Sequence, residues 1–491
     1  MIFILLAVAA IVAVGYFIFK EVHAASAIFA VGVLLLIIAA ATGRIEYSSA
    51  KIEPSGNAFY DELLIIESLF KSRYSGTGMA IMVLFGFVGY MRHIGADAKT
   101  VVALSKPLRK FNGSYWLVPI GFLVGTLLSL VVPSAAALSL LLVATLMPAL
   151  IAAGLSPLTV GAIIVTSSTI APSPLEAGLI QGASLVDMTV TEFVFGNVAK
   201  ATIPALVIVA FTHMWWQRRC DIKDAAKMQA EVGAGVGAGN GSAGTGAEVT
   251  AADAAEMQES ESDRRVREAV ERAEGLPGFY AILPLLPLIL IIVSAILNRM
   301  GVISFEAEIL PVTVVSLMVT MVIEAIRLHD INYAVDSLKE FFAGLGEAAA
   351  GVVALIVAAA ILVEGITQMG VIDGLTTIAQ RSSGAAVLMV IIFVAATGLM
   401  ALLTGSGVAP YFAFSEMVPG LAAQTSIHAP QMLTSIWSAS NLMRQGSPVN
   451  AAVIIVSGAL DVNPVELVRR TLVPMLVGTI ASVVFAFIFI A

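Results

Sequence analysis

Two polar clusters in the C-terminal part of the chain interrupt sequence that is otherwise strongly hydrophobic. The first is Thr404-Gly405-Ser406-Gly407, and the second runs from Ser440-Asn441 through Arg444 to Ser447-Pro448-Val449-Asn450. Non-helical backbone at membrane depth persists only where protein buries it or where it lines a cavity. An arginine near the bilayer centre costs at least about 2.5–3.5 kcal/mol on insertion scales. We therefore predict half of a substrate site here, with Arg444 binding an anion and Ser440 and Asn441 supplying hydrogen bonds or packing.

The motif Ser173-Pro174-Leu175-Glu176 resembles Ser447-Pro448-Val449-Asn450, because both place a serine and a proline at a predicted helix start. Serine can cap a helix that starts with proline, because the first helical position needs no N–H group. The free N–H groups and the dipole of such a half-helix attract an anion. Two further helix starts of this kind are predicted at Ser134 and at Ser406-Gly407. Four helix N-termini meeting near the membrane midplane would form an anion site, whereas the alternative is that these breaks serve packing alone.

Two acidic residues are candidates for holding a coupling ion, either a proton or sodium. Glu176 lies at a predicted helix start in mid-membrane, and Glu364 lies in the apolar run before the second predicted hairpin. A buried carboxylate readily takes up a proton, because burial disfavours its charged form. As alternatives, Glu176 closes a capping box with Ser173, Glu364 is wetted at a helix end, or one of them pairs with Arg444.

The composition is that of a polytopic membrane protein. The chain has 491 residues, of which 59% are hydrophobic and 12% are charged, and its mean hydropathy is +0.96. Nucleic acid is therefore not an expected partner. The sequence shows no nucleophile–base pair, phosphate-binding loop or metal-ligand spacing, so we predict neither an enzyme nor a resident metal or cofactor.

Apolar runs long enough to cross the bilayer occur in two series, 1–216 and 279–491. A polar linker with Gly/Ala-rich and charged parts, 217–278, separates them. In the first series we predict a re-entrant hairpin over 114–153 and a broken helix over 157–187. In the second series the equivalents are 385–423 and 430–460.

Landmarks recur in the same order in the two series. Pro148 matches Pro419, Ser173-Pro174 matches Ser447-Pro448, and Lys200 with Pro204 matches Arg470 with Pro474. Each series then holds five crossings and one hairpin. Because five is odd, the two copies have opposite orientations, as in the inverted repeats of transporters.

Positive charge gives the direction of insertion. The basic residues are densest between 92 and 110, in a segment predicted to lie on the inside, and inside loops carry the excess of lysine and arginine. The linker should therefore be cytoplasmic and both termini periplasmic. An amphipathic piece near 57–71 is predicted to lie on the membrane surface.

These motifs resemble those of the DcuC-type anaerobic C4-dicarboxylate carriers. The resemblance covers nearly the whole chain except the linker, and its motifs are Ser105-Lys106-Pro107-Leu108, Ala144-Thr145-Leu146 before Pro148, Thr404-Gly405-Ser406-Gly407 with Ala409-Pro410, Ser440-Asn441-Leu442 with Arg444 and Ser447-Pro448, and Arg469-Arg470-Thr471 with Pro474. It implies exchange, uptake or efflux of succinate, fumarate, malate or aspartate across the bacterial inner membrane. It also implies the elevator-type fold, in which homodimers move a substrate-bearing domain past a scaffold.

The prediction is accordingly an all-α secondary active transporter for small dicarboxylates, with about ten transmembrane helices and two hairpins. One alternative is a proton- or sodium-coupled symporter of another organic anion. Another is a cation/proton antiporter, in which Glu176 and Glu364 do the chemistry and Arg444 is structural.

Overall fold

The protein is an assembly of helices in the computed structural model. The structure describes residues 2–20, 22–45, 52–105, 114–235, 261–371, 374, 384–425 and 427–490. The basic residues expected at 106–110 and the centre of the linker, 236–260, lie outside this part. Within it there is no strand, and nine helices are long and apolar enough to cross a membrane. The predicted all-α polytopic class is confirmed.

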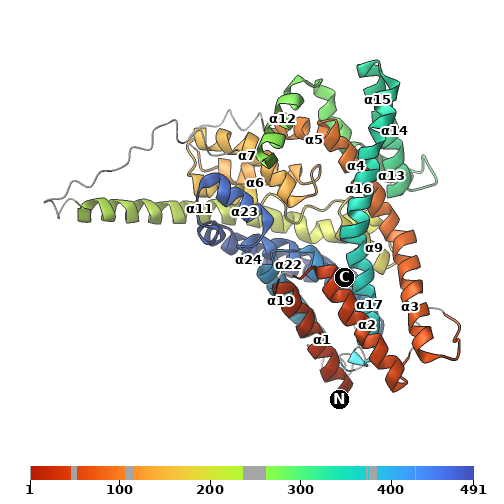
Figure 1. The fold of residues 1–491 in the computed structure, drawn as a ribbon. Coiled ribbons are helices and arrows are strands. Elements are labelled where there is room, and N and C mark those ends of the chain that lie inside the picture. Colours follow the sequence, from red (N-terminus) through yellow and green to blue (C-terminus); the bar gives the residue numbers. More distant parts are fainter. Residues whose placement is uncertain are drawn as a thin grey trace.

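Helices from both series build an oblique group on the right of Figure 1. It contains α1 (Ile2–Phe19), α2 (Ala24–Thr42), α3 (Ala58–Arg73), η1 (Tyr74–Gly78), α4 (Met79–His93), α5 (Ala96–Ser105), η4 (Gly278–Leu285), α13 (Leu286–Arg299), α14 (Ile309–Leu328), α15 (Ile331–Asp336), α16 (Leu338–Ala348), η5 (Ala349–Val353) and α17 (Ala354–Gln368). We call this set the framework group. Helix α3 covers the piece expected on the membrane surface and runs through η1 into α4 with a kink at Gly76. Its position relative to the bilayer stays a prediction.

Small residues set the closest helix contacts of the framework group. Helix α4 packs on α16, and α17 packs on α2. A Cβ at Gly344 would lie 2.6 Å from the carbonyl oxygen of Phe85, and a Cβ at Gly32 would lie 2.8 Å from the backbone nitrogen of Leu362. Glycine therefore allows these backbones to approach, which is the usual device for packing helices within lipid.

A second set of helices carries the predicted hairpins and breaks, and we call it the core group. It contains α6 (Leu117–Leu128), α7 (Ala135–Ala152), α8 (Pro157–Val165), α9 (Ala177–Leu185), α10 (Val190–Phe193), η3 (Val194–Val198), α11 (Ala199–Gly235), α19 (Ala385–Thr404), α20 (Val408–Ser415), α21 (Val418–Gln424), α22 (Ala429–Met443), η6 (Arg444–Gly446), α23 (Ala451–Leu460) and α24 (Pro464–Phe489). Helices α11 and α24 form its largest contact. Helix α11 extends beyond residue 216 into the expected linker. The C-terminal part of the linker forms a separate helix, α12 (Glu261–Gly275).

Both predicted helix breaks are present, but the helices after them begin later than expected. Helix α9 begins at Ala177 and α23 at Ala451, rather than at Pro174 and Pro448. The capping residues are Glu176 and Asn450, so the prediction of serine caps at Ser173 and Ser447 is wrong. The Ser173 hydroxyl instead accepts a hydrogen bond from the backbone N–H of Leu175.

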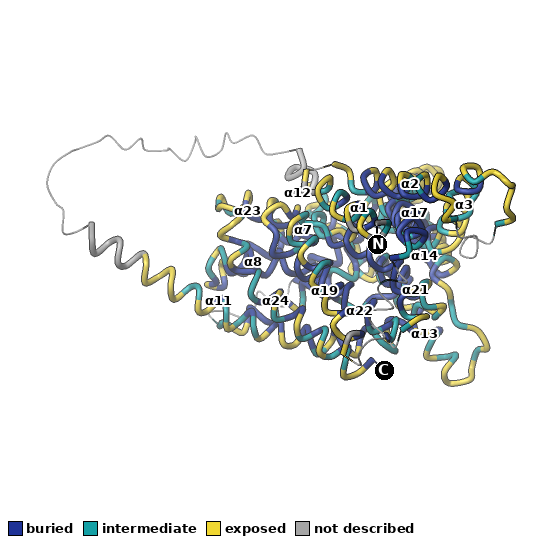
Figure 2. Tube along the Cα trace, turned by 90° about the horizontal axis from the view of Figure 1, so that it is seen from below, coloured by how far each residue is buried: buried dark blue, intermediate teal, exposed yellow. Residues whose placement is uncertain are grey.

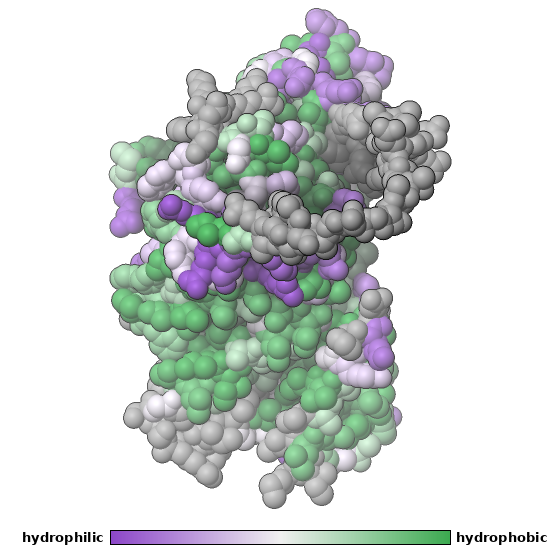
Figure 3. Space-filling view, turned by 90° about the vertical axis from the view of Figure 1, so that its left-hand side faces the viewer, coloured by the Kyte–Doolittle hydropathy of each residue, from purple (hydrophilic) through white to green (hydrophobic). Residues whose placement is uncertain are grey.

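The surface fits a membrane environment. Figure 2 shows buried residues concentrated in the body of the molecule, while residues 222–227 of α11, which lie beyond it, are exposed. The face in Figure 3 is apolar over a broad area, with hydrophilic side chains gathered mainly toward its upper part. Many large apolar side chains of α14 and α19 point outward, which is what contact with lipid requires.

Candidate functional site

The two helix breaks meet at Ser168. The Nη2 atom of Arg444, in the second break, donates to the carbonyl oxygen of Ser168 at 3.1 Å and contacts its hydroxyl at 3.2 Å. The amide of Gln445 also donates to that carbonyl oxygen. The non-helical backbone of the first break is buried, and a buried carbonyl oxygen requires a hydrogen-bond donor. Side chains of the second break supply the donors for Ser168.

Each hairpin packs directly against the break of its own series. A Cβ at Gly125 in α6 would lie 2.0 Å from the hydroxyl of Ser167. In the second series Gly405 has φ +69°, and a Cβ there would lie 2.8 Å from the backbone nitrogen of Asn450. The side-chain amide of Asn450 donates to the carbonyl oxygen of Gly405 at 2.8 Å. Glycine is needed at both contacts.

A small cavity of about 130 Å³ lies beside the crossing of the two breaks. Its apolar wall includes Phe85, Phe87, Tyr411, Phe412 and Trp437. Its polar lining residues are Ser129, Ser168, Thr169, Ser173, Glu176, Asn441 and Arg444. A cavity of about 150 Å³ holds benzene, so this one has the size for a small organic molecule.

Several polar atoms of the lining residues have no hydrogen-bond partner. Arg444 Nε, the hydroxyl of Thr169 and the hydroxyl of Tyr411 are all buried and unpaired. Glu176 lies close enough to Arg444 for electrostatic attraction, but no ion pair joins Arg444 to a carboxylate in the described part of the chain. Buried donors are normally paired, so this arrangement suits a ligand with acceptor oxygens.

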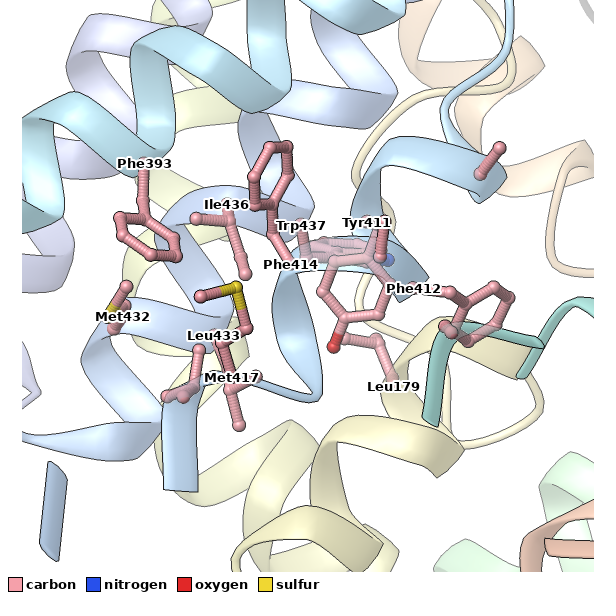
Figure 4. Close-up of a cluster of buried hydrophobic side chains, with 14 of the residues drawn as sticks. Leu179, Phe393, Tyr411, Phe412, Phe414, Met417, Met432, Leu433, Ile436 and Trp437 are labelled. Atoms are coloured by element: carbon pink, nitrogen blue, oxygen red, sulfur yellow. The ribbon is translucent and has the colours of Figure 1, made fainter. Parts of the chain in front are cut away.

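Glu176 has its carboxylate held from two sides. Its Oε2 atom accepts from the backbone N–H of Leu179 at 2.8 Å, as the N-cap of α9, and from the indole N–H of Trp437 at 2.9 Å. Figure 4 shows Trp437 beside Tyr411 and Leu179 in the apolar cluster behind this contact. The capping-box alternative is therefore wrong in its detail, because Glu176 is itself the cap.

The four predicted helix N-termini differ in whether a side chain caps them. The carboxylate of Glu176 caps α9, and the side chain of Asn450 caps α23. Ser134 caps α7 at 3.4 Å, is exposed and does not line the cavity. Helix α20 follows Gly407 without a side-chain cap, and Gly407 and Val408 line the cavity.

The structure sorts the predicted site residues into three sets. Ser173, Glu176, Gly407, Asn441 and Arg444 line the cavity. Thr404, Gly405, Ser406, Ser440, Ser447 and Asn450 do not line it. The Ser440 hydroxyl donates to the carbonyl oxygen of Trp437 and the Thr404 hydroxyl to that of Met400, each within its own helix, and the Asn450 amide joins the second break to Gly405. Ser134, next to the lining residue Pro133, and Glu364 do not line the cavity.

Glu364 belongs to a different environment in the framework group. It lies in α17 and is buried, and its carboxylate accepts a hydrogen bond from the Gln368 amide at 3.2 Å. The same amide donates to Glu62 of α3 at 3.4 Å. Any role of Glu364 in coupling would therefore be exerted at a distance from the cavity.

Sequence reasoning missed the partners that complete the site. Ser168, Trp437, Tyr411 and Gln445 are ordinary residue types for buried helices, and no spacing marks them. Only the polar character of 166–169 within an apolar run could have indicated Ser168 and Thr169.

Comparison with known proteins gives the family. The sequence model of DcuC, described as the C4-dicarboxylate anaerobic carrier, matches residues 3–491. "Anaerobic C4-dicarboxylate transporter DcuC" of Escherichia coli O6:H1 is 32% identical over 487 residues, which are 98% of this chain and 95% of the relative. The DcuC of Escherichia coli K12 is 31% identical over the same shares. A probable DcuC of Vibrio cholerae is 29% identical over 96% of this chain and 94% of its own.

These matches run through both series of helices and include the breaks and the hairpins. They bear out the resemblance drawn from the motifs, and they identify a transporter rather than an enzyme. The chain is therefore a multi-pass membrane protein that belongs to the DcuC family of anaerobic C4-dicarboxylate carriers.

Proposed function

We propose that this protein is a secondary active transporter of C4-dicarboxylates in the bacterial inner membrane, with succinate, fumarate, malate or aspartate as substrates. The observation that carries the proposal is Arg444, a guanidinium that lines a small cavity. Among the residues that the structure describes, its buried Nε atom has no hydrogen-bond partner and no carboxylate forms an ion pair with it. The names of the relatives agree with it. A planar guanidinium matches a carboxylate with two parallel hydrogen bonds.

The two carboxylates of the substrate would bind at different places. One would pair with Arg444, with Ser168 and Thr169 nearby. The other would lie at the start of α20, where Gly407 provides no side-chain cap for the first N–H groups and Pro410 has no N–H group. The aromatic wall would cover the short hydrocarbon chain between the charges. A diacid of four carbons fits both the volume and this division of charge.

Transport would proceed by movement of the core group past the framework group in a homodimer. Helical runs in the two series, 58–93 and 331–368, each contain a π-helical segment, which supports an inverted repeat. A second cavity of about 660 Å³ lies between the groups and also borders the first break, being lined by Pro174, Thr191 and Glu306. Cavities on two sides of one site suit alternating access.

Radiolabelled succinate counterflow in proteoliposomes tests the proposal. Vesicles preloaded with unlabelled succinate, fumarate or malate should take up labelled succinate, whereas vesicles preloaded with a monocarboxylate such as acetate should not. Exchange of sodium or protons without any dicarboxylate would instead support the cation/proton antiporter. Absence of succinate counterflow in folded wild-type protein would refute the proposal.

A further inference from the structure

A further buried acidic residue lies between the two groups of helices and does not line the substrate cavity. Glu416 follows α20, and its side chain is only 4% exposed. Its Oε2 atom forms an ion pair with Nη2 of Arg73, at the end of α3, at 2.5 Å. Its Oε1 atom accepts a hydrogen bond from the amide of Gln181 in α9. One carboxylate therefore joins the framework group to both the second hairpin and the first broken helix.

Arg73 is the cation that faces this carboxylate. Other titratable groups on the elements packed around it include Tyr411 in α20, Glu176 at the start of α9, Glu364 in α17, Tyr74 in η1, and Tyr60, Asp61, Glu62, Glu67 and Lys71 in α3 itself. Helices α2, α19 and α22, which contact α20, have no titratable side chain within their bounds. The negative charge of Glu416 thus depends on Arg73 for compensation.

Gln181 can form a hydrogen bond with Glu416 whether the Glu416 carboxyl group is ionised or protonated. In the structure its amide nitrogen donates to the carboxylate, while its own Oε1 atom is buried without a hydrogen-bond partner. A side-chain amide offers both donors and an acceptor. If Glu416 took up a proton, its new O–H could donate to Gln181 Oε1 after rotation of the amide. Protonated Glu416 could then stay buried without Arg73.

We propose that Glu416 is a coupling carboxylate that binds a proton whenever the core group moves away from Arg73. Removing one partner of a buried ion pair leaves an uncompensated charge, which is strongly unfavourable. Uptake of one proton from water converts the carboxylate to the neutral acid, and the proton is released when the pair with Arg73 forms again. This inference rests on the proposed transport function and assigns its proton-coupling residue.

Tyr411 places this carboxylate next to the substrate cavity. A Cβ at Gly178 would lie 3.0 Å from Glu176 Oε2 and 3.1 Å from Tyr411 Cε1, and a Cβ at Gly182 would lie 2.9 Å from the Tyr411 hydroxyl. The phenol ring therefore lies along one turn of α9, from the cavity toward Gln181. Protonation of Glu416 and binding of substrate in the cavity would therefore both act on α9.

The test uses full-length protein in proteoliposomes with a pH-sensitive dye inside. Wild-type vesicles should show proton movement when succinate is added and accumulate succinate when a proton gradient is imposed. Glu416→Gln mimics the neutral acid, so it should keep succinate counterflow but lose both responses to protons. Glu466→Gln, a change of an exposed carboxylate at the start of α24, is the control and should behave like wild type.

Each result separates this inference from the proposed function. Absence of succinate counterflow in the wild type refutes the transport function itself. Intact counterflow without proton movement in the wild type refutes proton coupling alone, and an unchanged proton response in Glu416→Gln refutes the assignment to Glu416. If Glu416→Gln does not fold, Glu416→Asp should keep counterflow with an altered pH dependence, and an unaltered one would overturn the assignment.

Discussion

The guanidinium of Arg444 borders a cavity whose wall is largely aromatic and aliphatic, and its strongest contacts are to one serine in the other half of the chain. Arg444, Asn441, Glu176, Ser173 and Gly407 were predictable, because polar or flexible residues are costly in apolar sequence. Of their partners, Ser168 is indicated only by the polar run 166–169, and Trp437 is not indicated at all. The indole that holds Glu176 is 261 positions away in the sequence, and only the tertiary structure brings it there.

The contact between Glu176 and Trp437 gives a prediction at the residue scale. Glu176→Gln should keep the fold almost as stable as wild type, since an amide oxygen can still accept from Leu179 and from the indole. Glu176→Ala removes the cap, at about 1 kcal/mol, and leaves the buried indole donor unpaired, at about 1–3 kcal/mol. Thermal unfolding in detergent measures both variants. Equal stability of Glu176→Ala and wild type would show that the contact does not matter.

At the scale of elements, sequence patterns located both helix breaks but missed where the helices restart, while the re-entrant hairpins stay a prediction. Serine followed by proline is a reasonable cap, yet Glu176 and Asn450 lie three residues further on and reach the backbone N–H groups instead. Likewise, the repeat matches Arg470 to Lys200 but does not indicate its ion-pair partners. Arg470 is 4% exposed and forms ion pairs with Asp221 and Asp224 of α11.

The ion pair of Arg470 with Asp221 should hold α24 against α11. Asp221 also accepts hydrogen bonds from Tyr115, Ser156 and Thr159. Asp221→Asn should therefore destabilise the protein, with about 3–5 kcal/mol as the upper range for breaking a buried pair. Asp336→Asn, which breaks an exposed pair with Lys339, should cost at most about 1 kcal/mol. Similar thermal shifts for the two variants would contradict this role of Arg470.

At the scale of the whole molecule, the sequence indicated a polytopic all-helical protein with two related series, and the structure adds how they divide. Each series contributes to both the framework group and the core group, so neither half of the chain is a separate unit. Periodicity and hydropathy cannot show this division, because it depends on contacts between α2 and α17 or between α11 and α24. The orientation of the chain in the membrane stays a prediction from its charges.

Labelling with an impermeant thiol reagent tests that orientation. In a Cys220→Ser background, cysteines at Ser55 and Met300 should react from the periplasmic side, while cysteines at Ile331 and Glu466 should react only after the membrane is opened. All four side chains are exposed, so access to them depends on the side of the membrane rather than on burial. The reverse pattern at all four positions would refute the predicted topology.

Binding of succinate to Arg444 variants tests the central claim most directly. Isothermal titration of purified, folded protein should show that Arg444→Lys binds succinate more weakly by about 1.5–3 kcal/mol, the range for a hydrogen bond to a charged group, and that Arg444→Ala binds it more weakly still. Arg299→Lys, at an exposed site at the end of α13, should bind like wild type. Wild-type affinity for succinate in both Arg444 variants would remove Arg444 from the site and contradict the proposed binding mode.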